Sequence, residues 1–155
     1  MIFIAELCQN HNGDFNVLEE MVYQAASNGA TYCKIQNIFA NDLTYREKFE
    51  NGVTQNNEIK VIKRPYQSEY NRLKKLELDY EMQSKFIELC KKNNVKALTT
   101  CFTIHRVEEL SNLDWNVVKV ASYDCGSLKM IKRLTDHFNE IIISTGASFD
   151  YEIFE

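Results

Sequence analysis

Polar side chains cluster near the amino terminus, in the stretch AELCQNHNGD over residues 5–14. Glu6 follows the apolar run IFIA directly, and Asn10 and His11 come within the next five residues. A plain loop needs turn-forming residues, but it rarely needs a carboxylate, side-chain amides and an imidazole together. The grouping therefore predicts that a polar ligand binds at the end of the first strand.

Further polar side chains stand at the carboxyl ends of later apolar runs. These residues are Lys34, Gln36, Thr100, Lys119, Ser122, Ser144 and Thr145. Loops that leave the carboxyl ends of parallel strands converge, and both barrels and open α/β folds build their active sites there. The pattern predicts that these side chains and Glu6 face a common site.

Short apolar runs alternate with segments of helical periodicity along the chain. The expected strands are residues 2–7, 31–36, 95–100, 116–121 and 140–145. Apolar residues recur at helical spacing between them, and Asn16, Asp79 and Ser127 are expected N-caps. Five strand and helix units, with strands that are apolar throughout, predict a parallel sheet covered by helices, which is an α/β fold.

Residues 37–78 interrupt this alternation. The segment is polar, rich in Asn, Glu, Lys and Arg, and too long for an ordinary connection between a strand and a helix. We expect a long insertion after the second strand, acting as a lid or a substrate wall.

The sequence stops on ASFDYEIFE, where Ser148 is an expected helix cap, so we also expect a domain truncated at its carboxyl end.

Composition narrows the function classes. The 155 residues suit one domain, and 22 acidic against 18 basic residues leave no basic excess for nucleic-acid binding. No apolar run approaches the roughly 20 residues of a membrane span, and the start is strand-like instead of signal-like, so we expect a cytoplasmic protein without a membrane partner. The five scattered cysteines form no CxxC pair, which indicates reduced thiols.

Five segments together resemble the sialic acid synthase family, which includes the N-acetylneuraminate, pseudaminic acid and legionaminic acid synthases. They are IAELCQNHNG, GATYCKIQ, KALTTCF, VVKVASYD and IIISTG, in the family's order and at similar spacings. The resemblance spans essentially the whole chain and implies a (β/α)₈ TIM barrel. Because such a barrel takes roughly 250 residues, residues 1–155 are expected to hold its N-terminal part, about five βα units.

The resemblance implies a reaction. Members of the family condense phosphoenolpyruvate with an N-acetylated hexosamine such as N-acetylmannosamine, release phosphate and form a nonulosonic, sialic-type acid. Mn²⁺ or Mg²⁺ polarises the sugar aldehyde in the full-length enzyme. The family's two metal-binding histidines, and the antifreeze-like domain that covers the partner's site in a homodimer, correspond to sequence beyond residue 155. The resemblance therefore implies no metal ligand within this chain.

Roles for the polar residues also follow from the resemblance. Those implied for phosphoenolpyruvate are Lys34, Thr100, Lys119, Ser122 and Ser144. Converging cations and hydroxyl donors of this kind suit a compact anion. Gln36 is expected at the site wall and Glu6 on the sugar side near the metal. Asp124 stands where the family usually has a Glu, and a carboxylate there stabilises a cationic intermediate or steers water, although Asp is one methylene shorter.

The turn after the first strand leaves two interpretations open. Asn10 and His11 are expected to contact substrate, and a structural role of His11 within the turn is an equal alternative. Cys8 replaces a Gly that is usual in the family. A zinc set is a minor alternative that would use Cys8, Cys101 and Cys125 with His11, although their spacing fits no known ligand pattern.

Other functions remain possible for the same residues. Lys34 and Lys119 could pair with carboxylates across the barrel mouth instead of binding substrate. Either lysine could also serve as the nucleophile of a Schiff-base aldolase on a similar barrel. A third hypothesis is a non-catalytic fragment that binds phosphoenolpyruvate or associates with other chains through unpaired sheet edges.

Overall fold

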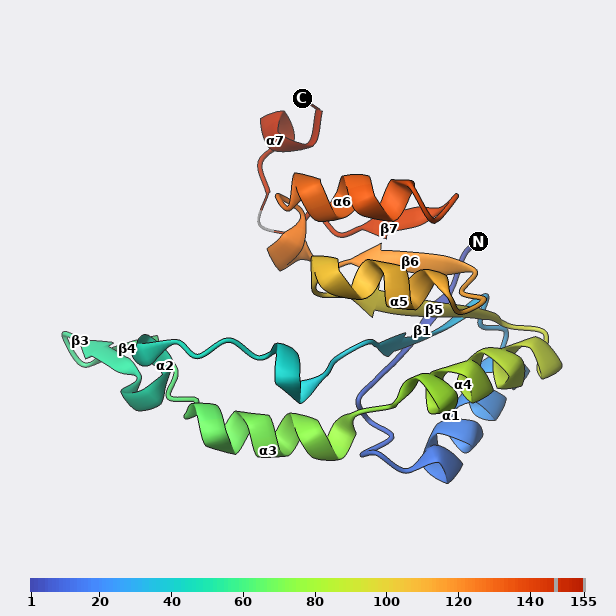
Figure 1. Ribbon diagram of the computed structural model, residues 1–155, viewed down its shortest axis with the longest axis horizontal. Helices are drawn as coiled ribbons and strands as arrows, with labels where there is room; N and C mark the ends of the chain where they lie inside the picture. The colour runs from blue at the N-terminus through green and yellow to red at the C-terminus, as the bar shows by residue number, and fades with distance from the viewer. Residues whose placement is uncertain (147, 155) are drawn as a thin grey trace. The chain divides into compact units, whose positions relative to one another are not determined.

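The computed structural model describes residues 1–146 and 148–154. The unit that comprises residues 1–37 and those from 78 onward is built on a five-stranded parallel sheet (Figure 1). The strands are β1 (Ile4–Cys8), β2 (Tyr32–Gln36), β5 (Lys96–Cys101), β6 (Val117–Val120) and β7 (Ile141–Ile143). They are hydrogen-bonded in the order β1-β2-β5-β6-β7, which is also their order along the chain. A doubly wound sheet reverses its order at a switch point, whereas a barrel keeps sequence order, so the topology is that of part of a barrel.

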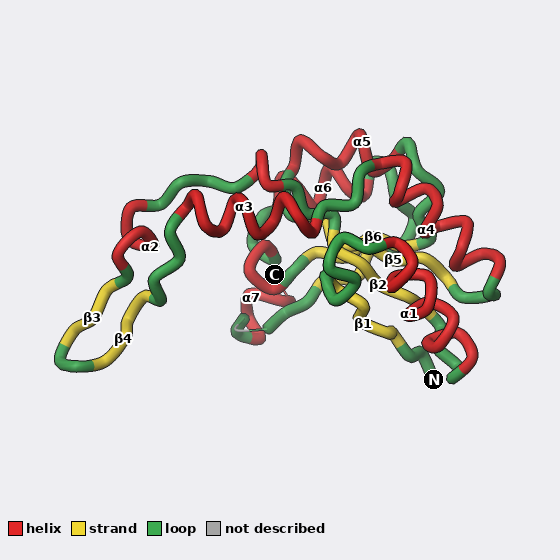
Figure 2. Tube along the Cα trace, turned by 90° about the horizontal axis from the view of Figure 1, so that it is seen from below, coloured by secondary structure: helices red, strands yellow, loops and turns green. Residues whose placement is uncertain are grey.

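Helices follow the strands and cover one face of the sheet (Figure 2). They are α1 (Phe15–Ser27), α4 (Tyr80–Lys92), α5 (Val107–Ser111) and α6 (Leu128–Thr135), and a short α7 (Asp150–Phe154) comes after β7. Their apolar sides and the strand residues that face them form the main core. Its largest helical members include Leu18, Phe86, Leu110, Met130 and Leu134, each at most 1% exposed.

The opposite face of the sheet is apolar at one end and polar at the other. Tyr32, Leu98 and Val117 form a smaller buried cluster there. Side chains along a strand alternate between faces, so residues two positions further on share that face. Lys34, Thr100 and Lys119 are those residues, and they lie toward the carboxyl ends of their strands.

Residues 38–77 form a separate compact unit within the segment expected as an insertion. The unit contains η1 (Ala40–Asp42), α2 (Glu47–Asn51), a hairpin of β3 (Val53–Gln55) and β4 (Glu58–Val61), and α3 (Tyr66–Leu76). Tyr70 Oη donates a hydrogen bond to Asn41 Oδ1 at 2.8 Å, and Glu50 Oε1 accepts one from the Tyr66 amide at 2.7 Å. The insertion therefore has regular structure of its own.

Three helix starts test the expected caps. Ser127 is the N-cap of α6 as expected, although its side chain makes no capping hydrogen bond. Asp79 caps α4 as expected, because its Oδ1 accepts a hydrogen bond from the Met82 amide at 2.8 Å. The cap expected at Asn16 is wrong: α1 begins at Phe15, and Asp14 Oδ1 accepts from the Asn16 amide at 2.8 Å. Within the described residues, no helix has the length and apolar character needed to cross a membrane.

Candidate active site

Glu6 and Lys34 form the strongest polar contact on the open face of the sheet. They are register partners on β1 and β2, and Lys34 Nζ donates to Glu6 Oε2 at 2.5 Å. Lys34 is 3% exposed and Glu6 is 47% exposed, so the carboxylate is the outer member of the pair. The open alternative that Lys34 pairs with a carboxylate is therefore realised, and the Glu6 side chain stays about half exposed.

Lys119 is the second cation on this face. It lies on β6, half-buried, and its Nζ donates to the Val120 carbonyl at 3.3 Å. Burial lowers the pKa of Lys119 most, the nearby charge of Lys34 lowers it further, and Glu6 raises it. These effects place Lys119 in the electrostatic neighbourhood of the Glu6 and Lys34 pair. Two ammonium groups against one carboxylate leave a net positive region suited to an anion.

Gln36 and Thr100 stand opposite each other in the register of β2 and β5, and Thr100 is the register partner of Lys119 on its other side. Thr100 is buried, and its Oγ1 has no hydrogen-bond partner in the described part of the chain. A buried hydroxyl without a partner costs free energy unless a ligand or water satisfies it. Thr100 is thus a donor that remains available beside Lys119.

Ser122, Asp124 and Ser144 lie in loops beyond β6 and β7. Ser122 and Asp124 belong to the short helix η3 (Ser122–Asp124), and Ser144 continues the sheet through its amide, which donates to the Val120 carbonyl at 3.1 Å. A Cβ built on Gly146 would lie 3.4 Å from the Cβ of Ser122, so the two loops touch. Burial raises the pKa of Asp124 above its ordinary value.

The structure separates Asp124 from Glu6 along the sheet. β1 carries Glu6, η3 follows β6, and β2 and β5 lie between β1 and β6. The two proposed catalytic carboxylates thus approach the site from different strands. In a curved sheet, side chains from such strands converge toward one mouth instead of forming a direct pair.

Asn10 and His11 occupy the turn after β1. Asn10 is exposed, and its carbonyl accepts a hydrogen bond from Asn12 Nδ2 at 3.3 Å. His11 is 2% exposed, and its Nδ1 accepts from the Gly13 amide at 3.0 Å, so a neutral ring carries its proton on Nε2. Burial lowers the pKa of His11. The imidazole therefore stabilises the turn, as the structural alternative expects.

The described residues contain no group of three or more His, Cys, Asp or Glu side chains that could hold a metal ion. The zinc set suggested by the cysteines and His11 is therefore wrong. Glu6, the residue expected near the family's metal, has one of its oxygens committed to Lys34. The side chains present here do not by themselves make a divalent-metal site.

Sequence reasoning missed Gln83, a buried glutamine on α4 that is 1% exposed. Its side chain bonds to Asn37, the residue after Gln36, with Asn37 Nδ2 donating to Gln83 Oε1 at 3.0 Å. A signal was present in the sequence, because a glutamine one turn before Phe86 and Ile87 interrupts the apolar stripe of its helix. A polar residue at a core position indicates a buried hydrogen-bond partner.

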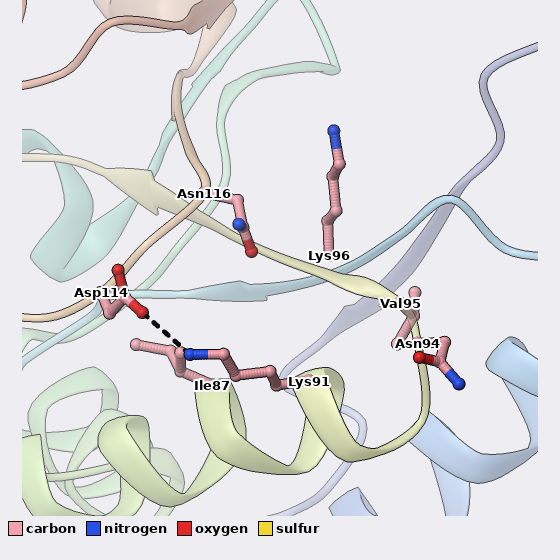
Figure 3. A pocket seen from close by; sticks show the side chains of 7 residues that line it. All are labelled: Ile87, Lys91, Asn94, Val95, Lys96, Asp114 and Asn116. Carbon is pink, nitrogen blue, oxygen red and sulfur yellow. Dashed lines mark hydrogen bonds and ion pairs between the residues drawn. The ribbon is translucent and has the colours of Figure 1, made fainter.

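A cavity of about 210 Å³ lies at the other end of the strands (Figure 3). Lys91 from the end of α4, Lys96 from the start of β5 and Asp114 before β6 line it, and Lys91 Nζ lies 3.5 Å from Asp114 Oδ2. Functional loops of barrels converge at the carboxyl ends of strands, and residues at the amino ends contribute mainly to stability. The cavity is therefore separate from the candidate active site.

Comparison with known proteins gives consistent matches. The family model described as the NeuB family matches residues 21–155. The chain is 31% identical over 153 residues to the N,N'-diacetyllegionaminic acid synthase of Campylobacter jejuni, covering 94% of this chain and 42% of that protein. It is 24% identical over 150 residues to the pseudaminic acid synthase of Helicobacter pylori, covering 97% of this chain and 43% of that protein.

A solved structure shows the same fold. The N-acetylneuraminic acid synthetase of Leptospira borgpetersenii, crystallised with citrate, superposes with a TM-score of 0.78 at 22% identity, over 99% of this chain and 47% of that one. The chain thus spans roughly two fifths of the length of the curated relatives it matches. The α/β fold and partial barrel expected from the sequence are confirmed, and with the family model covering residues 21–155, the chain belongs to the NeuB family.

Proposed function

We propose that this chain supplies the phosphoenolpyruvate-binding part of the active site of a nonulosonic acid synthase. Relatives across the same region are synthases of legionaminic and pseudaminic acids. The observation that carries the proposal is the convergence of Lys34, Thr100 and Lys119 on one face of the sheet, toward the carboxyl ends of their strands. Two cations and an unpartnered hydroxyl suit a small phosphorylated carboxylic acid better than a neutral sugar.

The residues divide the binding between them. Lys119 and the hydroxyl of Thr100 bind the anion directly, and Lys34 adds charge from its buried position beside Glu6. Ser122 and Ser144 donate hydrogen bonds from the two touching loops beyond β6 and β7. Glu6 holds Lys34, and we propose that its exposed carboxylate faces the sugar.

Asp124 has a separate role in the proposed reaction. Its raised pKa means that the carboxyl takes up a proton more readily than an ordinary Asp does. A half-buried carboxyl of this kind can exchange a proton with the water that attacks the reacting carbon, or face the positive charge that develops there. Gln36 contributes a wall, and Asn10 contributes an exposed amide beside Glu6's strand.

A divalent metal supplies aldehyde activation in this type of reaction when it is bound. We propose that its main ligands are the histidines that the family resemblance implies for sequence beyond residue 155. We likewise propose a homodimer for the whole protein. Every step assigned to this chain uses only its own cations, hydroxyls and carboxyls.

One observation favours a second enzyme function. The lowered pKa of Lys119 increases the fraction of neutral amine, which is the form that attacks a carbonyl to give a Schiff base. Lys34 is a poorer nucleophile because its ammonium is held by Glu6 at 2.5 Å. A Schiff-base aldolase on this scaffold would therefore use Lys119.

A binding-only function is the third candidate for this chain by itself. β1 and β7 each pair with a single neighbour in the sheet, which leaves strand edges available for association. Ile143 on β7 is 40% exposed, so the edge is also partly apolar. Such a chain would bind phosphoenolpyruvate or other chains without turnover.

Product analysis separates the three functions. The chain is incubated with phosphoenolpyruvate, N-acetylmannosamine and Mn²⁺, and inorganic phosphate and keto acid are measured. Phosphate release that requires both substrates supports the synthase. In a parallel incubation with pyruvate and sodium borohydride, a reduced pyruvate adduct on Lys119, absent from Lys119→Met, supports the aldolase and contradicts the synthase. Binding of phosphoenolpyruvate with neither product nor adduct supports the phosphoenolpyruvate-binding role of this chain without turnover by the chain alone.

A further inference from the structure

Gln83 bridges two segments that are far apart in sequence. It lies in the second turn of α4, and its side chain is 1% exposed. Its Oε1 accepts a hydrogen bond from Asn37 Nδ2 at 3.0 Å, and its Nε2 donates one to the Leu78 carbonyl at 2.8 Å. Both bonds are buried, so each is shielded from competition with water.

The direction of the two hydrogen bonds is fixed by chemistry. The Leu78 carbonyl can only accept, so the Gln83 side chain must turn its Nε2 toward that carbonyl. Oε1 then faces Asn37, which must present its Nδ2 as the donor. Asn37 Oδ1 is left buried and without a partner among the described residues. The bridge is therefore specific for an amide at position 83.

The bridged residues mark the base of the inserted unit. Asn37 is the last residue of the barrel segment before residues 38–77, and Leu78 is the first residue after them. Gln83 thus joins the point where the chain leaves the barrel to the point where it returns. A glutamine that merely filled space in the core would have no reason to satisfy both points at once.

The first and last parts of the inserted unit are also joined to each other by hydrogen bonds of Glu77. Glu77 Oε1 accepts a hydrogen bond from the Ala40 amide at 2.5 Å, and Glu77 Oε2 pairs with Lys74 Nζ at 2.5 Å. Gln83 therefore links Asn37 to Leu78 within the barrel segment, and Glu77 links to Ala40 within the inserted unit. Asn37 and Leu78 are thus held together through Gln83, and we call these two residues the neck.

Asn37 also connects the neck to the candidate active site. Its amide donates to the Thr100 carbonyl at 3.2 Å and so extends the pairing of β2 with β5 by one residue. Gln36 and Thr100, the register partners on the open face, lie immediately beside this bond. Holding Asn37 therefore also holds the ends of the two strands that carry them.

We propose that Gln83 is a positioning residue that closes the neck and fixes the carboxyl end of β2. Its effect on substrate rests on the proposed function, because it acts through Gln36 and Thr100. Its effect on the neck is independent of that function. Loss of the bridge opens the neck while the rest of the barrel segment stays folded.

Hydrogen exchange measured by mass spectrometry tests the proposal on the whole chain. Gln83→Met keeps the length and helix preference of the side chain but removes both hydrogen bonds. We expect exchange in peptides covering residues 36–43 and 73–79 to rise about tenfold or more, because two buried hydrogen bonds are lost. Peptides from β5 and β6 should keep the wild-type rate. Gln24→Met, the same change at an exposed glutamine of α1, is the matched control and should change neither region.

Two further variants keep the test decisive if Gln83→Met does not fold. Gln83→Glu keeps an acceptor for Asn37 but sets a buried carboxylate against the Leu78 carbonyl, so it should raise local exchange at least as much as Gln83→Met. Asn37→Ala removes only the bond between Asn37 and Gln83, so it should give a smaller local increase. Unchanged exchange at the neck, or an equal increase throughout the sheet, would overturn the proposal. Because the readout needs no substrate, a failure of phosphoenolpyruvate binding would leave this result unaffected.

Discussion

Glu6 on β1 and Lys34 on β2 stand opposite each other, with Lys34 Nζ 2.5 Å from Glu6 Oε2. The lysine is almost completely buried, whereas about half of the glutamate side chain is exposed. Burying an ammonium without a counter-charge is costly, so the carboxylate at the end of the first strand has an evident structural reason.

Removal of Glu6 should therefore destabilise the fold. We expect Glu6→Gln to lower the free energy of unfolding by about 1–3 kcal/mol, less than for a fully buried pair because Glu6 is half exposed. Urea denaturation measures the change. Glu6→Gln combined with Lys34→Met should recover part of the loss, since the buried charge is then gone.

A matched control for this experiment lies in the exposed hairpin. Glu58 Oε2 and Lys60 Nζ are also 2.5 Å apart, but both side chains are largely exposed. Glu58→Gln should cost less than about 1 kcal/mol, as surface ion pairs usually do. An equal loss of unfolding free energy in Glu6→Gln and Glu58→Gln would contradict this prediction, because it would mean that the buried Lys34 needs its carboxylate no more than the exposed Lys60 does.

His11 should make stability depend on pH in the acid range. Its pKa is lowered by burial, so the unfolded chain takes up a proton below the ordinary value of 6.5 before the folded chain does. Stability is therefore fully present above pH 6.5 and is lost as pH falls from 6.5 toward the lowered folded pKa. Denaturant midpoints across this range should show a slope that His11→Gln removes.

The exposed His137 provides the control for His11. The slope should persist in His137→Gln. A pH profile of His11→Gln identical to that of the wild type would mean that other groups cause the acid loss.

Two glycines with positive φ should respond differently to alanine. Gly29 has φ +85° and no neighbouring atom within 4 Å of the position that a Cβ would take, whereas a Cβ on Gly52 would lie 2.8 Å from the Val61 carbonyl oxygen. Gly29→Ala should cost about 1–2 kcal/mol from the left-handed backbone alone. Gly52→Ala adds a clash with backbone, so local exchange within residues 49–64 should increase far more than exchange around Gly29 does in its own variant.

Lys119 should oppose stability at neutral pH. Its folded pKa lies below the unfolded value of 10.5, so the folded chain releases this proton first as pH rises. The free energy of unfolding therefore increases as pH rises from the lowered folded pKa of Lys119 to 10.5. Lys119→Met should stabilise the chain at pH 7 and flatten the alkaline rise, both measured by thermal unfolding. A destabilised Lys119→Met would indicate that packing of its methylenes outweighs the charge.

Much of the barrel segment could be predicted from the sequence because strand alternation is a local signal. The apolar runs around Lys34, Thr100 and Lys119 predicted that these residues lie on strands, and their place at the carboxyl ends of those runs predicted a common site. The register of the sheet then shows that the three share one face. The pairing of Lys34 with Glu6 depends on which residue of β1 lies opposite it, and that register is set by the assembled sheet. Strand pattern alone does not determine it.

The insertion was less predictable, although one signal in it was missed. Asn56 and Asn57 have φ of +53° and +62°, the positive values that a two-residue hairpin turn requires. Asparagine tolerates this conformation, so the pair between β3 and β4 predicts the hairpin in retrospect. Cys8 shows the same physics at the site: its φ of +52° explains why the resembling family usually has Gly there.

The cap of α1 shows the limit of local rules. Asp14 and Asn16 are both good N-cap residues, and Asn16 also has Glu19 three positions later. The turn that contains His11 decides between them, since the Asp14 amide donates to the His11 carbonyl at 2.8 Å and fixes where the helix can begin. The start of α1 thus depends on the fold of this turn, in which His11 is buried, and not only on the helix residues themselves.

Titration of phosphoenolpyruvate into the chain at pH 7, followed by ³¹P NMR, tests the central proposal most directly. We expect saturable binding that Lys119→Met weakens about tenfold or more, because a charge-assisted contact is lost, while Lys92→Met at an exposed position of α4 leaves it unchanged. Binding should also weaken as pH rises through the lowered pKa of Lys119. Absence of binding, or equal binding by wild type and Lys119→Met, would contradict the account.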